Sequence, residues 1–157
     1  MKLKLLDVYS KSSELVRKHP LKFIFTITIL LRIIFLLFNY PLWWDSHVYV
    51  SIGKYIFSGG EFGIWESFRP LVHPFLLGLF WKFNIDPFIA GKLLDVIFST
   101  IAVYLVYLIG KKIFDKDIAI IASLIFSLTP VFLMITGLIL SDPLGLVFGL
   151  LGIYLIV

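Results

Sequence analysis

The chain has 157 residues, of which 60% are hydrophobic, 17% aromatic and only 15% charged, with a mean hydropathy of +1.01 and a net charge of +4. A soluble fold of this size cannot hide so much apolar surface, because a small domain keeps a large share of its surface in water. The composition therefore excludes a soluble enzyme, a disordered tail and a disulfide scaffold. The chain has no cysteine, which also excludes thiolate metal sites and cysteine nucleophiles. We expect an all-α integral membrane protein.

Four apolar stretches of a single module, residues 21–157, predict about four transmembrane helices, at about 21–40, 87–110, 118–134 and 143–157. The first follows a polar, basic segment, residues 1–20, and precedes no small-residue cleavage site, so we interpret it as a retained signal anchor. The last is about fifteen residues long and reaches about 22 Å, less than the hydrocarbon core of about 30 Å. We expect a membrane partner chain or a missing carboxy-terminal region to complete it.

The stretch 70–83 is apolar but interrupted by His73 and Pro74, and its length favours an interfacial or re-entrant helix over a span. Basic residues concentrate in the segment 1–20 and between Lys111 and Lys116. The positive-inside rule then favours a multi-pass protein of the cell membrane with both termini in the cytoplasm. The loop 41–86 lies outside in this topology.

The external loop 41–86 is rich in aromatic residues, which favour the level of the lipid headgroups. Val48 and Ile52 have helical spacing, Asp45 is placed to cap the helix start, and Gly59 is placed to end the helix. We therefore expect one or two short helices in the outer interface.

Four residues on the predicted outer side carry chemistry. Asp45 and Asp142 are carboxylates at the same membrane face, and Arg69 suits a phosphate or carboxylate ligand. His73 follows Arg69 by four residues, so the two could share a helix face. Two carboxylates with an arginine nearby indicate an active site. The alternatives are helix caps for the two aspartates, a lipid headgroup contact for Arg69 and a structural role for His73.

Three stretches of the chain carry a resemblance to a known family: Trp44-Asp45-Ser46-His47-Val48-Tyr49, Phe68-Arg69-Pro70-Leu71-Val72-His73-Pro74, and Leu128-Thr129-Pro130 to Ser141-Asp142-Pro143-Leu144. Together they resemble the amino-terminal module of the GT-C glycosyltransferases, nearest to the branch of protein O-mannosyltransferases and aminoarabinose transferases. Ser46 stands where many relatives have a second acidic residue. The resemblance covers only the first part of such an enzyme.

The resemblance implies sugar transfer from a polyprenyl- or dolichyl-phosphate donor to an acceptor on the external face. Asp45 would act as base on the acceptor, and Asp142 would order the site or hold a divalent cation. Arg69 would hold the donor phosphate, whose leaving charge needs compensation, and His73 and Tyr49 would complete the substrate site. The partners are then the lipid bilayer and a lipid-linked sugar, with no nucleic acid.

Two other classes of function also fit the residues. The chain could be a non-catalytic accessory subunit, or a truncated homologue that binds lipid phosphates. It could also be a transporter subunit in which Arg32, Lys92 and Asp95, polar residues within apolar stretches, line the pathway. Arg32 is expected to pair with an acidic residue or to snorkel, and Lys92 and Asp95 are expected to pair at three-residue spacing.

Overall fold

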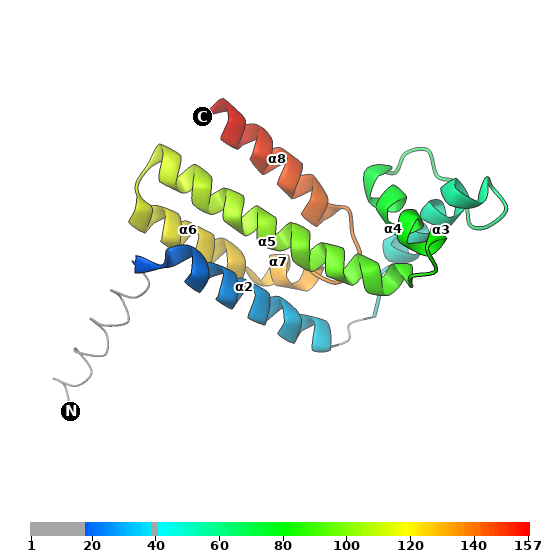
Figure 1. Cartoon of the computed structure of the whole chain (residues 1–157), viewed down its shortest axis with the longest axis horizontal. Coiled ribbons are helices and arrows are strands. Elements are labelled where there is room, and N and C mark those ends of the chain that lie inside the picture. The colour runs from blue at the N-terminus through cyan, green and yellow to red at the C-terminus, as the bar shows by residue number, and fades with distance from the viewer. Residues whose placement is uncertain (1–17, 39–40) are drawn as a thin grey trace.

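The computed structural model describes residues 18–38 and 41–157, and the regular structure in this part of the chain is helical throughout. It comprises α2 (Pro20–Leu37), α3 (Trp44–Ser58), α4 (Val72–Lys82), α5 (Pro87–Ile113), α6 (Lys116–Leu128), α7 (Pro130–Ile135) and α8 (Asp142–Ile156) (Figure 1). The all-helical prediction is confirmed. Most of the basic amino-terminal segment, and the end of the first predicted span, lie outside the described residues.

Helices α2, α5, α6 and α8 run side by side along the long axis of the molecule, with α5 in contact with each of the others (Figure 1). We call α2 and α5–α8 the bundle. Ala102 and Val103 of α5 are fully buried against a cluster that includes Ile24 of α2. A side chain at Gly110 would come within 3.0 Å of the Ala119 backbone, so a glycine there lets α5 and α6 approach closely.

Among the residues that the structure describes, two helices are long and apolar enough to cross a membrane. Helix α2 has 18 residues and α5 has 27, each with a hydropathy of 2.1, and they reach about 27 and about 40 Å. They correspond to the first two predicted spans. Helix α8 is apolar but shorter, with 15 residues.

The predicted third span, 118–134, is not one continuous helix. Helix α6 ends at Leu128, and Pro130 begins α7. Thr129 between them has an extended backbone, with φ −59° and ψ 119°, because a residue before proline is driven away from helical geometry. The prediction from hydrophobicity therefore located the apolar stretch correctly but missed the break in the helix at Thr129.

Helices α3 and α4 form a separate pair at one end of the bundle, and we call residues 44–82 the cap (Figure 1). The two helices cross with their backbones in contact, since a Cβ at Gly53 would lie 2.5 Å from the carbonyl oxygen of Pro74. Helix α4 has 11 residues, about 16 Å, so it is too short to span a bilayer, as predicted. Helix α3 ends where expected, at Gly59, whose φ is +68°.

Neither Asp45 nor Asp142 caps a helix, which was the alternative role considered for both residues. The N-cap residue of α3 is Trp43 and that of α8 is Ser141, and neither forms a side-chain cap bond. Asp45 and Asp142 lie inside the first turns instead. A carboxylate there still interacts favourably with the positive end of the helix dipole.

Arg32 lies fully buried in the bundle, and its predicted pairing is wrong. Its Nε donates to the Ser99 hydroxyl at 2.5 Å, and its Nη1 donates to the Ser127 hydroxyl at 3.4 Å. The guanidinium also lies over the ring of Phe132, 5.0 Å from its centroid. Neutral hydroxyls from α5 and α6 thus take the place of the expected carboxylate, and they join α2 to both helices.

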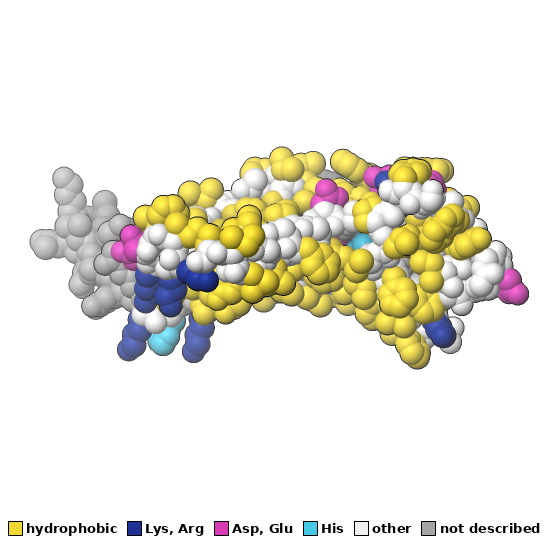
Figure 2. Space-filling view, turned by 90° about the horizontal axis from the view of Figure 1, so that it is seen from above, with side chains coloured by type: hydrophobic (Ala, Val, Ile, Leu, Met, Phe, Trp, Pro, Cys, Tyr) yellow, Lys and Arg dark blue, Asp and Glu magenta, His cyan; other side chains and the backbone are white. Residues whose placement is uncertain are grey.

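Basic side chains gather at the end of the bundle away from the cap (Figure 2). This end holds the beginnings of α2 and α6 and the end of α5 (Figure 1). The basic residues of these helix ends are Lys18, Lys22, Lys111, Lys112 and Lys116. The molecule is therefore electrically asymmetric along its long axis.

Candidate functional site

Arg69 is held between two carboxylates at the surface of the cap. Its Nη2 donates to Asp45 Oδ1 at 2.7 Å, and its Nε donates to Glu66 Oε2 at 3.1 Å. The side chains of Arg69, Glu66 and Asp45 are 18%, 24% and 37% exposed, respectively. The hydrogen bonds with Asp45 and then Glu66 raise the pKa of Arg69 above its ordinary value. The guanidinium is therefore a permanent positive charge within reach of water.

The loop between α3 and α4 brings Arg69 to Asp45. The Ser51 hydroxyl accepts a hydrogen bond from the Ile64 amide at 3.1 Å, which ties this loop to the side of α3. Because α4 begins only at Val72, Arg69 and His73 do not share a helix face, and that prediction is wrong. Pro70 keeps Arg69 out of the helix, because the residue before a proline is driven away from helical geometry.

Tyr49 connects the ion-paired arginine to the interior. It follows Asp45 by one turn of α3 and is 4% exposed. Its ring lies 5.6 Å from the Arg69 guanidinium carbon and meets the His73 ring edge to face, with centroids 5.5 Å apart. Its hydroxyl lies 2.9 Å from the hydroxyl of Ser141, at the start of α8. Tyr49 therefore touches two other predicted site residues and the loop before Asp142.

His73 points into the protein and is fully buried. Its Nε2 lies 4.0 Å from Asp95 Oδ1, too far for a hydrogen bond, and neither ring nitrogen has a hydrogen-bond partner among the described residues. Burial lowers the pKa of His73 to about 4, so the ring is neutral at physiological pH. The geometry places His73 behind Tyr49, away from the surface where Asp45 and Arg69 lie.

Asp142 is exposed in the first turn of α8. Within the described part of the chain its carboxylate forms no hydrogen bond or ion pair. It follows directly on Ser141, whose hydroxyl contacts Tyr49. The structure thus brings Asp45, Arg69 and Tyr49 into contact, and relates Asp142 to them through one neighbouring residue.

Sequence reasoning missed Glu66 and Ser141 in this region, and it gave Asp95 the wrong partner. Glu66 precedes Arg69 by three residues, a spacing that could have revealed the pair. Asp95 was expected to pair with Lys92, and this is wrong. Its Oδ2 instead accepts the backbone amides of Gly137 at 3.1 Å and Ile139 at 2.8 Å. Partners more than forty residues away leave no local signal.

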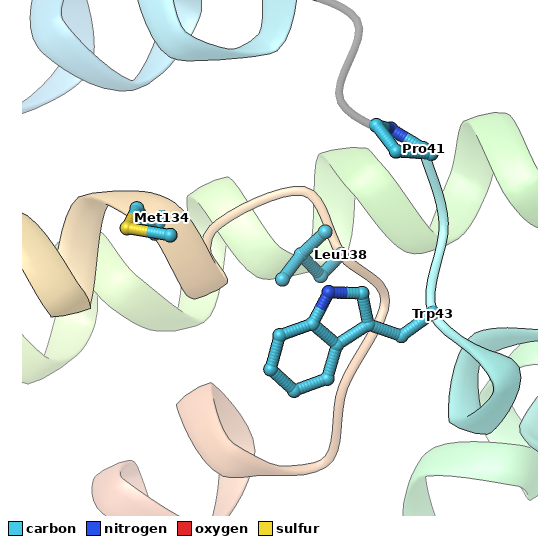
Figure 3. Close-up of a pocket in the computed structure, with 4 residues that line it drawn as sticks. All are labelled: Pro41, Trp43, Met134 and Leu138. Carbon is cyan, nitrogen blue, oxygen red and sulfur yellow. The ribbon is translucent and has the colours of Figure 1, made fainter.

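An apolar pocket of about 100 Å³ opens below the cap. It lies between the connection from α2 to α3 and the connection from α7 to α8, and its lining residues are Pro41, Trp43, Met134 and Leu138 (Figure 3). A narrower, more polar pocket adjoins it, shares Met134 and Leu138, and includes Lys92. The apolar pocket therefore lies next to a pocket that Lys92 lines.

The described residues contain no group of three or more histidine or acidic side chains that could hold a metal ion. Asp45 and Glu66 face the same guanidinium, which supplies the positive charge between them. The divalent cation considered for Asp142 therefore has no ligand cluster in this part of the chain.

Two of the described helices are long and apolar enough to cross a membrane, as a membrane protein requires. Residues 68–157, more than half of the chain, match the family described as dolichyl-phosphate-mannose-protein mannosyltransferase, and the chain belongs to this membrane-bound GT-C family. Membership implies glycosyltransferase function with a lipid-linked sugar. The matched range includes Arg69, His73 and Asp142 and begins after Asp45 and Tyr49. No curated protein and no solved structure matches the chain.

Proposed function

We propose that this chain is a glycosyltransferase module that moves a sugar from a polyprenyl- or dolichyl-phosphate donor to an acceptor at the external membrane face. Family membership supports the donor class. The observation that carries the assignment of residues is the 2.7 Å ion pair between Asp45 and Arg69 at the cap surface. This pair supports the proposal because a carboxylate beside a fixed positive charge could serve as the base and compensate the leaving phosphate in sugar transfer.

Asp45 and Arg69 have complementary roles in this proposal. The acceptor hydroxyl or amine attacks the anomeric carbon, and Asp45 takes the acceptor proton as the new glycosidic bond forms. The bond from the anomeric carbon to the phosphate oxygen breaks, and the lipid phosphate leaves as an anion beside Arg69. An arriving donor phosphate competes with Asp45 for the guanidinium, and this competition turns the carboxylate toward the acceptor.

The remaining site residues support these two. Tyr49 underlies the Arg69 guanidinium and would hold it against the donor phosphate through a cation–π contact. His73 packs behind Tyr49 and would fix the orientation of its ring. Asp142, exposed at the start of α8, would order the acceptor side of the site.

The donor lipid needs an apolar space beside the charged site. The pocket lined by Pro41, Trp43, Met134 and Leu138 has this character and opens next to the cap. One segment of the polyprenyl chain would lie there, and the aromatic side chains of the cap would shield the reacting phosphate from water.

Four spans with the cap outside give this site its membrane orientation. Helices α6 and α7 follow one another from Lys116 to Ile135 and together reach about 30 Å, the thickness of the hydrocarbon core. The basic helix ends lie opposite the cap (Figure 2) and would remain in the cytoplasm, together with both termini. Asp45, Arg69 and Asp142 would then open on the outer face.

The test measures binding and transfer separately on the protein as its gene encodes it, reconstituted in lipid nanodiscs. Labelled polyprenyl-phosphate sugars report transfer, and unlabelled polyprenyl phosphate reports binding. We expect wild-type protein to bind and transfer, and Asp45→Asn to bind without efficient transfer. Binding without transfer in the wild type would instead identify a lipid-phosphate-binding subunit. Flux of the lipid that depends on Arg32 would identify a transporter.

A further inference from the structure

The connection between α7 and α8, residues 136–141, packs between the cap and the bundle, beside the direct contact of α4 with α5. It has no regular secondary structure, yet Leu138, Ile139 and Leu140 are 5%, 0% and 5% exposed. Buried backbone amides need hydrogen-bond partners because water cannot reach them. In this connection the amides of Gly137 and Ile139 both donate to one carboxylate oxygen, Oδ2 of Asp95.

The same connection contains a strained residue. Ile139 has a φ of +58°, and a β-branched residue in this left-handed region is a genuine outlier. Such a conformation persists only where its surroundings hold it. Ile139 rests on Gly91, where any added Cβ would come within 2.6 Å of its Cγ2. Gly91 and Asp95 are one turn apart on α5, so one face of that helix holds the connection by packing and by hydrogen bonds.

The opposite side of the connection holds α3. The Ser46 hydroxyl donates to the carbonyl oxygen of Leu138, and the Tyr49 hydroxyl meets the Ser141 hydroxyl at 2.9 Å. Helix α3 otherwise packs mainly on α4. Both attachments come from the first turns of α3, which also carry Asp45.

We propose that Asp95 is a positioning residue for the glycosyl-transfer site. It fixes the connection 136–141 against α5, and the connection in turn fixes the start of α3, and with it Asp45 and Tyr49, over the bundle and beside the apolar pocket that Leu138 lines. Asp95 does not touch the substrate. Its Oδ2 acts through two backbone amides, and its Oδ1 faces His73. The catalytic part of this inference rests on the proposed function; the structural part does not.

The first experiment measures whether Asp95 fixes the cap. The chain is free of cysteine, so spin labels can be placed at Glu61→Cys and Lys111→Cys, two exposed sites in the cap and at the far end of α5. Pulsed electron spin resonance then gives the distribution of cap-to-bundle distances in nanodiscs. We expect a narrow distribution in the parent protein and in Asp95→Asn, because the amide oxygen of Asn still accepts both backbone amides. Asp95→Leu removes the acceptor and should broaden the distribution.

Gly91→Ala provides an independent variant if Asp95→Leu does not fold. It leaves every polar group in place and displaces Ile139, so the same broadening is expected. The matched control is Ser123→Ala, since the Ser123 hydroxyl is buried but bonds only to the carbonyl of Ile120 in its own helix. An unchanged narrow distribution in both Gly91→Ala and Asp95→Leu would overturn the proposal.

The second experiment measures sugar transfer in the same variants. Misplacement by about 1 Å costs roughly 100-fold in rate, so Gly91→Ala and Asp95→Leu should lower kcat strongly and change KM for the donor little. Asp95→Asn should retain transfer. Loss of transfer in Asp95→Asn with an unchanged distance distribution would overturn the positioning role, because it would assign the function to the carboxylate itself. If the wild type shows no transfer, the proposed function fails, and the distance measurement alone still decides whether Asp95 holds the connection.

Discussion

The bundle and the cap each contain an arginine that is shielded from bulk water, and the two arginines differ in the partners that surround their charge. In the bundle, Arg32 is fully buried and surrounded by the hydroxyls of Ser99 and Ser127. In the cap, Arg69 remains partly exposed and is paired with the carboxylates of Asp45 and Glu66. The first arrangement joins three helices and offers no exchangeable anion. The second holds two carboxylates at a partly exposed surface.

Under the proposed function, this difference separates a structural charge, Arg32, from a ligand-binding charge, Arg69. Two neutral hydroxyls from neighbouring helices offset part of the desolvation cost of Arg32. Carboxylates at a wet surface bind Arg69 less permanently, because water and competing anions screen exposed pairs. The transporter hypothesis expected function along the charges of the bundle, whereas the geometry places exchangeable charge in the cap. The following predictions test this separation.

The largest expected effect is all-or-none labelling of the two ends of the molecule. Single cysteines at Ser58 and Ser67, both in the cap, should react from outside with a membrane-impermeant thiol reagent in intact cells. Asp115→Cys, between α5 and α6 at the basic end, should react only after the membrane is opened. The cysteine-free parent provides the background. External labelling at position 115 would refute the four-span topology.

Replacing the proposed base in the cap should give the next largest effect. Asp45→Asn removes the carboxylate and keeps its size, so transfer should fall by roughly 100-fold to 10,000-fold. The melting temperature should change little, since Asp45 forms no helix-cap bond and its exposed ion pair contributes modestly.

Asp86→Asn is the matched control for this substitution. Asp86 caps α5 by accepting the Phe88 amide, and Asn caps a helix about as well as Asp. We expect both the melting temperature and the transfer rate of Asp86→Asn to match the wild type. Near-normal transfer in Asp45→Asn would remove the strongest residue from the enzyme assignment.

Replacing Arg69 and Arg32 in turn should change the affinity for the donor in one region and not in the other. Arg69→Met eliminates the charge that faces the phosphate and should weaken binding of polyprenyl phosphate by about 10-fold to 100-fold, since hydrogen bonds to charged groups contribute about 1.5–3 kcal/mol. Arg32→Met removes the same charge from the bundle and should leave the affinity unchanged. Equal losses in the two variants would contradict the separation.

The features of the fold that sequence analysis predicted correctly depend on local signals. Hydrophobic runs of sufficient length indicated α2 and α5, and the glycines after Ser58 indicated the end of α3. The short apolar run around His73 indicated a helix too short to span. The break at Thr129 also had a local cause in Pro130, but continuous hydrophobicity concealed it.

The contacts of the candidate site were not predictable in the same way. Asp45 and Arg69 are 24 positions apart, and Asp95 and Ile139 are 44 apart, so only the folded chain reveals that they meet. The family resemblance implied two separate roles for Asp45 and Arg69. It gave no indication that they form one ion pair, that Glu66 joins them, or that Asp95 holds the connection beneath them.

The smallest expected effect is a loss of stability on acidification that arises at His73, where the cap meets the bundle. Burial lowers the pKa of His73 from an ordinary 6.5 to about 4, so between these values the unfolded chain binds a proton that the folded chain excludes. Stability should therefore be fully present above pH 6.5 and fall as the pH drops toward 4. For a protein of this size we expect a decrease of about 6–12 °C in melting temperature from this residue between pH 7 and pH 4.

His73→Phe should make the melting temperature less dependent on pH in this window, because the ring keeps its edge-to-face contact with Tyr49 and cannot bind a proton. The matched control is His47→Phe, at an exposed histidine that contacts the ring of Phe88, and it should keep the full acid dependence. The melting temperatures of the three proteins in nanodiscs between pH 7 and pH 4 provide the comparison. The same acid loss in wild type and His73→Phe would show that the folded protein accepts the proton at His73. Asp95 Oδ1, 4.0 Å away, would then be its partner, and a charge pair of the bundle would extend into the cap.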